Sequence, residues 1–140
     1  MTPKEECEEL LNFLLSFAEN QLKKRGEFYP FGAVTPDSGE ISPTAFYDSD
    51  NEFPDSAEVI RILTEAHREM AEKGEIKASG ICWDAKVHLE NGNQTDAIMI
   101  SLEHRERYSV VVGQPYRFGF LKKLNLSSIF AQEGRHDIFC

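Results

Sequence analysis

The sequence predicts an α+β fold in which two helices pack on one face of an antiparallel sheet of about five strands. Two stretches repeat apolar residues at the three- and four-residue spacing of an amphipathic helix, one up to Gly26 and one between Asp55 and Gly74. Paired runs of strand composition meet at turn residues 36–39 and 91–92. The expected order is therefore helix, hairpin, helix and three-stranded meander, followed by an aromatic tail from residue 115.

Length and composition indicate one core. The chain has 140 residues, of which 41% are hydrophobic and 28% charged, as in globular domains. The sequence contains no internal repeat, low-complexity segment or linker that would mark a boundary. We therefore expect a single α+β domain over residues 1–140.

The first helix has clear start and stop signals. Thr2-Pro3-Lys4-Glu5 forms a capping box with proline at the first helical position, and three basic residues followed by Gly26 suit a helix end. One apolar stripe connects these ends and contains Cys7, Leu10, Leu11, Leu14, Phe17, Ala18 and Leu22. This stripe should face the core.

The first hairpin is expected from strands at Phe28–Val34 and Ile41–Tyr47, joined by the turn residues 36–39. The stretch GEFYPFGA at residues 26–33 places three aromatic rings around Pro30, and alternation makes both faces of this hairpin apolar. A contiguous exposed apolar patch is rare on a monomer. We therefore expect the aromatic tail or a second subunit to cover the face that the helices leave open.

The second helix should begin after Asp55 in another capping box, with His67 as a hydrogen-bonded helix residue. A second hairpin then turns at Asn91-Gly92, a strong hairpin signal. A two-residue loop there would pair Trp83 with Ile100 and Ala85 with Ile98. It would place Cys82 on the opposite, polar face. A third strand is expected near residues 108–112, and Glu133-Gly134 is a candidate for a last turn.

Charge separates this chain from nucleic-acid and membrane binders. Its 15 basic and 24 acidic residues give a formal charge of −9, which repels phosphate backbones and anionic lipids. Between residues 26 and 60 the sequence has no Lys or Arg. The acidic segment there is our candidate binding face for a basic protein partner, and its candidate residues are Asp37, Glu40, Asp48, Asp50, Glu52 and Asp55.

The sequence favours a cytoplasmic protein. It lacks an N-terminal signal pattern and any apolar run of about 18 residues, the length that a membrane span needs. Cys7, Cys82 and Cys140 are odd in number and scattered, which suits reduced thiols better than a disulfide framework.

Candidate chemistry is sparse, and we expect no cofactor and no metal. Cys82, Asp84 and His88 share a strand face, but Cys82 and His88 would lie about 20 Å apart, too far for one zinc ion. Residues 48–52 begin like a calcium loop, but Phe53 and Val59 stand where glycine and glutamate are needed. An enzyme is therefore the less favoured reading, with Cys82 and His88 as its best candidates.

Two resemblances bear on function. The element order over about the first 113 residues is similar to that of profilin-like and roadblock/longin folds, which implies an interaction platform that dimerises; the tail departs from that pattern. FYPFGA after an acidic amphipathic helix resembles small uncharacterised bacterial cytosolic proteins of the toxin-immunity kind. Neither resemblance transfers a functional residue.

Three functions remain open from the sequence. The first is a non-enzymatic protein-binding module, of the immunity or inhibitor type, whose acidic segment binds a basic partner. The second is a small-molecule-binding protein or hydrolase, which requires a pocket with a perturbed Cys, His or carboxylate. The third is a structural homodimer subunit joined through the sheet of residues 28–47.

Overall fold

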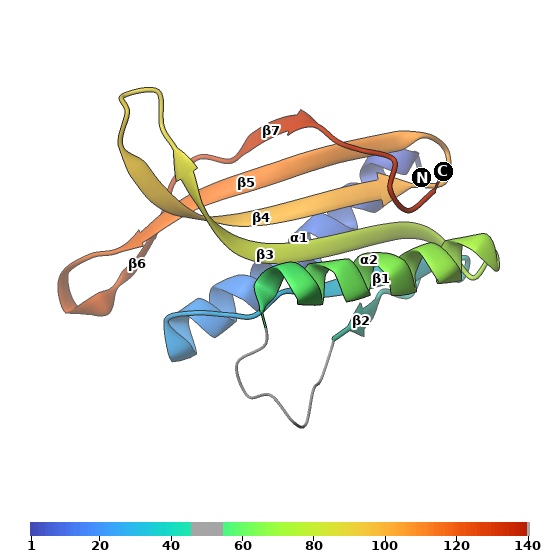
Figure 1. Cartoon of the computed structure of the whole chain (residues 1–140), viewed down its shortest axis with the longest axis horizontal. Helices are drawn as coiled ribbons and strands as arrows, with labels where there is room; N and C mark the ends of the chain where they lie inside the picture. Colours follow the sequence, from blue (N-terminus) through green and yellow to red (C-terminus); the bar gives the residue numbers. More distant parts are fainter. Residues whose placement is uncertain (46–54, 140) are drawn as a thin grey trace.

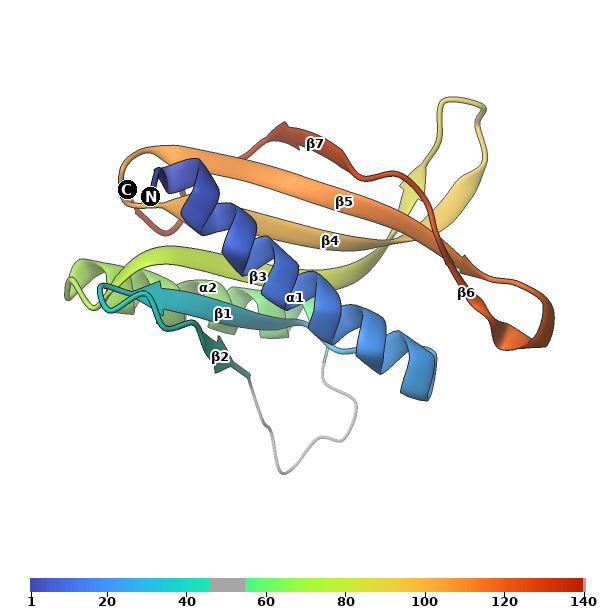
Figure 2. The same cartoon turned by 180° about the vertical axis from the view of Figure 1, so that it is seen from behind.

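A computed structural model describes residues 1–45 and 55–139 as a mixed α+β structure, a curled antiparallel sheet with one helix on each side (Figures 1 and 2). The helices are α1 (Pro3–Arg25) and α2 (Ser56–Glu72), with a short 3-10 turn, η1, at Phe120–Lys122. The strands are β1 (Phe31–Pro36), β2 (Ser42–Thr44), β3 (Ile76–His88), β4 (Gln94–His104), β5 (Tyr108–Phe118), β6 (Leu124–Leu126) and β7 (Phe130–Glu133).

Within the described residues the sheet contains seven strands rather than about five, because the tail adds two. The order is β2-β1-β3-β4-β5-β6, and β7 also pairs with β5. Strands β6 and β7 pair with different parts of β5, at residues 116–118 and 110–113. The tail turns at residues 119–123. The candidate turn at Glu133-Gly134 joins no hairpin, because β7 ends at Glu133 and no strand follows it in the described residues. Pro43 lies in the edge strand β2, where a missing amide hydrogen removes no inner ladder bond.

Helix α1 has the predicted ends and the predicted buried stripe. Thr2 and Glu5 form the reciprocal capping box, and Gly26 closes the helix with a left-handed φ of 78°. Five stripe residues are buried: Cys7, Leu10, Leu14, Ala18 and Leu22. Local signals were sufficient here because both caps and the apolar spacing lie within one continuous segment.

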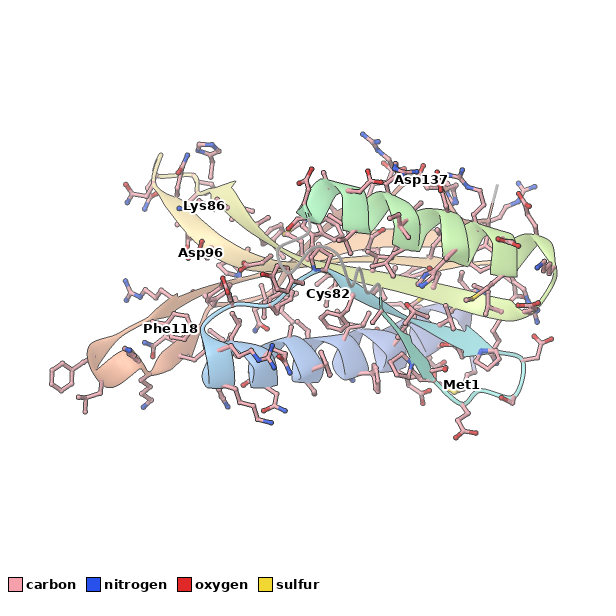
Figure 3. All side chains as sticks on the ribbon, turned by 60° about the horizontal axis from the view of Figure 1, so that its bottom comes forward. Met1, Cys82, Lys86, Asp96, Phe118 and Asp137 are labelled. Carbon is pink, nitrogen blue, oxygen red and sulfur yellow. The ribbon has the colours of Figure 1, made fainter. Side chains whose placement is uncertain are left out.

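The two helices lie on opposite faces of the sheet, so the expectation of a shared face was wrong. Figure 3 shows α2 on one side of the sheet and α1 on the other. Neighbouring residues of β3 explain the arrangement: Gly80 faces Leu10 and Leu14 of α1, whereas the Ser79 hydroxyl bonds His67 of α2. Successive side chains of a strand point to opposite faces, and consecutive residues in the first half of β3 are buried, so this part of the strand is buried on both faces. Its apolar residues do not reveal which face meets which helix.

The β3-β4 hairpin has a different register from the one predicted. Trp83 pairs with Met99 and Cys82 with Ile100. The loop holds three residues instead of two: Leu89 donates to the Asn93 carbonyl, and Gly92 adopts a φ of 86°. A one-residue shift moves every partner to the other face. Cys82 therefore lies in the core beneath α1 instead of on a polar face.

Helix α1, and not the tail, packs on Phe28 and Phe31 of the first hairpin, whereas Tyr29 is exposed. The Phe31 ring centroid lies 4.6 Å from that of Phe17 on α1 and 5.9 Å from that of Phe28. Both Phe28 and Phe31 belong to the α1 core cluster. Phe46 and Tyr47, also assigned to this hairpin, lie outside the described residues.

Gly80→Ala should destabilise the fold by about 1–3 kcal/mol, because its Cβ would lie 2.5 Å from Leu14 Cδ1. Urea denaturation measures the change. Adding Leu14→Ala should make the double variant less destabilised than the sum of its parts, whereas Lys86→Ala on the exposed end of β3 should change stability little. Strict additivity of Gly80→Ala and Leu14→Ala would contradict this packing.

Candidate functional site

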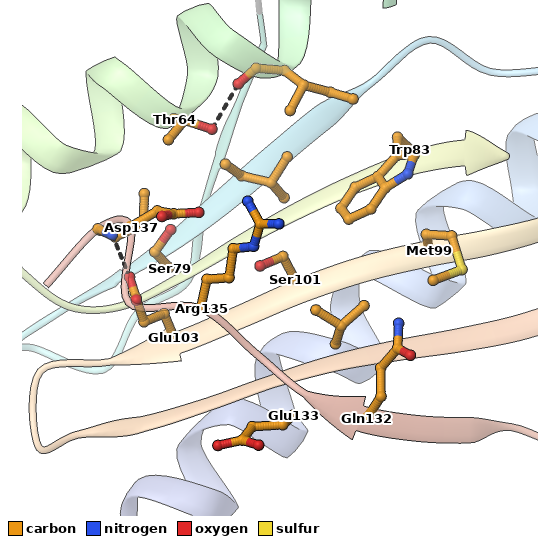
Figure 4. Close-up of a pocket in the computed structure, with 14 residues that line it drawn as sticks. Thr64, Ser79, Trp83, Met99, Ser101, Glu103, Gln132, Glu133, Arg135 and Asp137 are labelled. Atoms are coloured by element: carbon orange, nitrogen blue, oxygen red, sulfur yellow. Dashed lines mark hydrogen bonds between the residues drawn. The ribbon is translucent and has the colours of Figure 1, made fainter. Parts of the chain in front are cut away.

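A groove of about 380 Å³ lies on the α2 face of the sheet (Figure 4). Helix α2 packs on β1 and β3. On the other side of the groove, β7 pairs with β5, and residues of the segment 134–139 also line the groove. The groove occupies the space between. Its apolar floor comes from Ile81, Trp83, Met99 and Val111, and Ile60 of α2 forms part of one wall. This volume lies in the range of small-ligand sites.

Glu103 is the most unusual residue of the groove. It is a carboxylate on β4 that is only 2% exposed. Its Oε2 accepts the backbone N–H groups of Ile138 at 2.6 Å and Phe139 at 3.0 Å. Its Oε1 is buried and has no hydrogen-bond partner among the described residues. Among the described residues, the basic atom nearest to this oxygen is His136 Nδ1, which lies 3.8 Å from Oε1. One oxygen of the carboxylate therefore holds the tail, and the other is buried without a hydrogen bond.

Burial raises the pKa of Glu103, and the two backbone hydrogen bonds offset this only in part. A buried carboxylate is costly unless it is paired, since the charged form loses its water. A cation or a hydrogen-bond donor that reached Oε1 would remove part of that cost. The site therefore favours a ligand that brings such a group.

The tail segment 134–139 is tied to three elements, which gives the groove a fixed wall. Besides the Glu103 contacts, Arg68 Nε of α2 donates to the Asp137 carbonyl at 2.7 Å, and the Ser109 hydroxyl of β5 donates to the Arg135 carbonyl. Ile138 is buried against Val59 and Leu63 of α2. Because these hydrogen bonds hold the tail backbone, the tail side chains that face the groove have fixed positions.

Charged side chains gather at the tail side of the groove. Figure 4 shows Arg135 extending from the tail into the groove, with Asp137 and Glu103 beside it and Trp83 beyond its guanidinium. Glu133 also lines the groove. With three carboxylates against one guanidinium, this end is acidic. A basic group of the chain itself already lies in the groove, so the space accommodates one.

The buried Ser79 on the groove floor is hydrogen-bonded to His67, as a nucleophile is to its base. Ser79 Oγ lies 2.7 Å from His67 Nδ1, and His67 Nε2 lies 2.8 Å from Thr44 Oγ1. Burial lowers the pKa of His67 to about 4, and a hydroxyl instead of a carboxylate stands behind the ring. An imidazolium would therefore be poorly stabilised, and Ser79 is only 1% exposed. The chain of bonds joins α2 to the sheet, as predicted for a hydrogen-bonded His67.

The described acidic candidates from the sequence are Asp37, Glu40 and Asp55. Asp37 pairs with Arg105 at 2.7 Å, Glu40 is exposed, and Asp55 caps α2 by accepting the Ala57 N–H. Asp48, Asp50 and Glu52 lie outside the described residues. Binding through the acidic segment therefore stays a prediction.

Cys82 and His88 do not form a catalytic pair. Cys82 is fully buried beneath α1 and its pKa is raised by desolvation, whereas His88 is exposed near the end of the β3-β4 hairpin. A thiol in such an environment is unreactive. Within residues 1–45 and 55–139, no three His, Cys, Asp or Glu side chains converge as metal ligands would.

Sequence reasoning missed Glu103 and the groove. Glu103 follows an apolar run on β4, where alternation in the correct register places it on the α2 face with Ser101 and Met99. A carboxylate inside an otherwise buried strand was the available signal. The tail residues that complete the site are separated from Glu103 by about 35 positions, and no periodic pattern connects them.

Comparison of the chain with protein-family models, with curated proteins and with solved structures finds no match. Neither α1 nor α2, the α-helices of the described residues, is long and apolar enough to cross a membrane. A function for this protein is therefore argued from the geometry of the groove.

Glu103→Ala should loosen the tail, because it leaves the Ile138 and Phe139 amides without their acceptor. Loss of a buried acceptor costs about 1–3 kcal/mol, so these two amides should exchange with solvent roughly ten to a hundred times faster. Hydrogen exchange followed by NMR measures the change. Glu103→Gln keeps an acceptor oxygen and should preserve most of the protection. Equal protection in Glu103→Ala would contradict the clamp.

Stability should fall on acidification through His67. The pKa of His67 is about 4 in the folded state and near 6.5 when unfolded, so the unfolded chain binds the extra proton between these values. The contribution of His67, at most about 3 kcal/mol, is complete above pH 6.5 and is lost toward pH 4. Urea denaturation at pH 7 and pH 5 should show a smaller loss in His67→Gln than in the parent. Identical losses would exclude His67 as the titrating group.

Proposed function

We propose that this protein is a non-enzymatic cytoplasmic binding module of the immunity or inhibitor type, and that a basic side chain of its protein partner enters the groove and pairs with Glu103. The observation that carries the proposal is the unbonded, buried Oε1 of Glu103 at the acidic end of an apolar groove. A Lys or Arg side chain matches both parts, since its apolar stem can lie on Trp83 while its head pairs with the carboxylate.

The acidic segment supports the same kind of partner. Asp55, the last of its candidate residues, caps α2, and Ile60 of the groove wall follows five residues later, about 8 Å along the helix axis. Acidic residues beside a site that takes a cation steer a basic partner to it and suppress acidic competitors. The formal charge of −9 acts in the same direction.

A hydrolase is the weaker alternative for this groove. The Ser79-His67 pair lacks a carboxylate behind the imidazole, and Ser79 lies almost fully buried. A bound substrate would have to displace groove contacts to reach its hydroxyl. Simple binding needs no nucleophile or base, only the groove and a cationic group that reaches the Glu103 carboxylate.

The chain offers a direct probe of the groove, because Trp83 is its single tryptophan. N-acetyl-arginine amide should change Trp83 fluorescence with a dissociation constant in the millimolar range, as expected for one side chain without its protein. Glu103→Gln should weaken this at least about tenfold, the effect of losing roughly one charge-assisted hydrogen bond. Arg135→Ala should strengthen it by removing the guanidinium that already lies in the groove.

The matched control is Glu90→Gln in the exposed hairpin loop, which removes one charge far from the groove and should leave the titration unchanged. N-acetyl-glutamate amide serves as the acidic counterpart and should give no response. If Glu103→Gln and Glu90→Gln had the same effect, or if the acidic amide bound equally well, the proposal would be wrong.

A further inference from the structure

The hairpin formed by β5 and β6 projects from one end of the sheet (Figures 1 and 2). Its tip is apolar and exposed. Phe120 is 87% exposed and Leu121 84% exposed, the highest values among the large hydrophobic residues of the described chain. We call residues 116–126 the finger. Large side chains left so open at the end of a projecting hairpin indicate a surface for contact with another molecule.

The backbone of the tip is strained at two residues. Leu121 has a φ of 59° and Lys122 a φ of 58°, both in the left-handed region, although neither is glycine. This conformation costs an ordinary residue about 1–2 kcal/mol, and such strain is concentrated at functional sites. A glycine would relieve it without loss of the turn, so the sequence keeps bulky residues where local conformation disfavours them.

The finger differs in charge from the rest of the chain. Arg117, Lys122 and Lys123 lie within it, and it contains no acidic residue, whereas the whole chain carries −9. An apolar tip with basic neighbours fits a hollow that is apolar inside and acidic at its edge. The groove has this character: an apolar floor, with Glu103, Glu133 and Asp137 on its tail side.

The finger and the groove of one molecule are far apart. Figure 3 shows Phe118 at one end of the molecule and Asp137 toward the other, with Cys82 between them. The contact therefore requires two molecules. We infer that a second copy of this chain inserts its finger into the groove, with Phe120 or Leu121 on the apolar floor and Lys122 and Lys123 at the acidic edge.

This inference rests on the proposed function of the groove and names its partner as the chain itself. Two copies that exchange fingers about a two-fold axis use each groove once, and the assembly closes as a dimer. This contact differs from dimerisation through residues 28–47, where α1 already covers Phe28 and Phe31. An anionic lipid surface would also attract a basic apolar tip, but the charge of −9 opposes it and the acidic groove offers the closer match.

The test is sedimentation velocity over a range of protein concentrations. The parent should shift from monomer to dimer as concentration rises, and Phe120→Ser with Leu121→Ser should remain monomeric. These two positions are exposed, so the variant should keep the parent's unfolding curve. Glu103→Gln combined with Glu133→Gln and Asp137→Asn should also remain monomeric, and an equimolar mixture of the two variants should form a heterodimer. Trp83 fluorescence should change with concentration in the parent only.

Three results would overturn the inference. They are a parent that stays monomeric at every concentration, a finger variant that dimerises like the parent, and binding of the parent to phosphatidylserine vesicles, lost in the finger variant, without self-association. The arginine-amide titration separates this failure from that of the proposed function. A Trp83 response that depends on Glu103 in a monomeric parent rejects the dimer and leaves the groove as a site for another basic partner.

Discussion

Burial of β3 on both faces is the constraint on which the rest of the structure depends. Gly80 leaves no side chain between the strand and α1, so Leu10 and Leu14 reach the sheet directly. On the other face Ser79 meets His67 of α2, and Gly32 of β1 provides the room for the imidazole, since a Cβ there would lie 2.8 Å from His67 Cε1. One strand thereby fixes the positions of both helices relative to the sheet.

The groove follows from this arrangement. Helix α2 is held over β1 and β3 by His67, and β7 is paired with β5, so the floor between them is formed by residues of β3, β4 and β5. Glu103 lies where the groove meets the tail, and its two carboxylate oxygens have different roles. Its Oε2 completes the tail wall, and its Oε1 gives the groove an unpaired acceptor in a desolvated place. Structure and binding are thus coupled through one carboxylate, which is why its replacement by glutamine and by alanine should have different consequences.

The charge distribution of the chain joins the groove to the finger. Most acidic side chains are dispersed, and several are used locally: Asp37 pairs with Arg105, Glu6 with Lys77, and Glu58 with Arg61. The basic residues of the finger have no such ion pair among the described residues, and they flank the most exposed apolar side chains. An acidic hollow and a basic projection on the same chain provide the two halves of a self-complementary contact.

The sequence by itself determined the features that depend on neighbours along the chain. Both helices, their caps at Thr2 and Asp55, the turn at residues 36–39 and the existence of the β3-β4 hairpin could be read from local signals, because capping and helical spacing act within a few residues. The side of the sheet on which α2 packs, the one-residue register of the hairpin and the pairing of the tail with β5 were decided by tertiary structure. Strand β3 is apolar on both faces, so its pattern gave no preference for either side of the sheet or for either register of the hairpin. The groove belongs to this second group, since Glu103 meets Ile138 and Phe139 only after the whole sheet has formed.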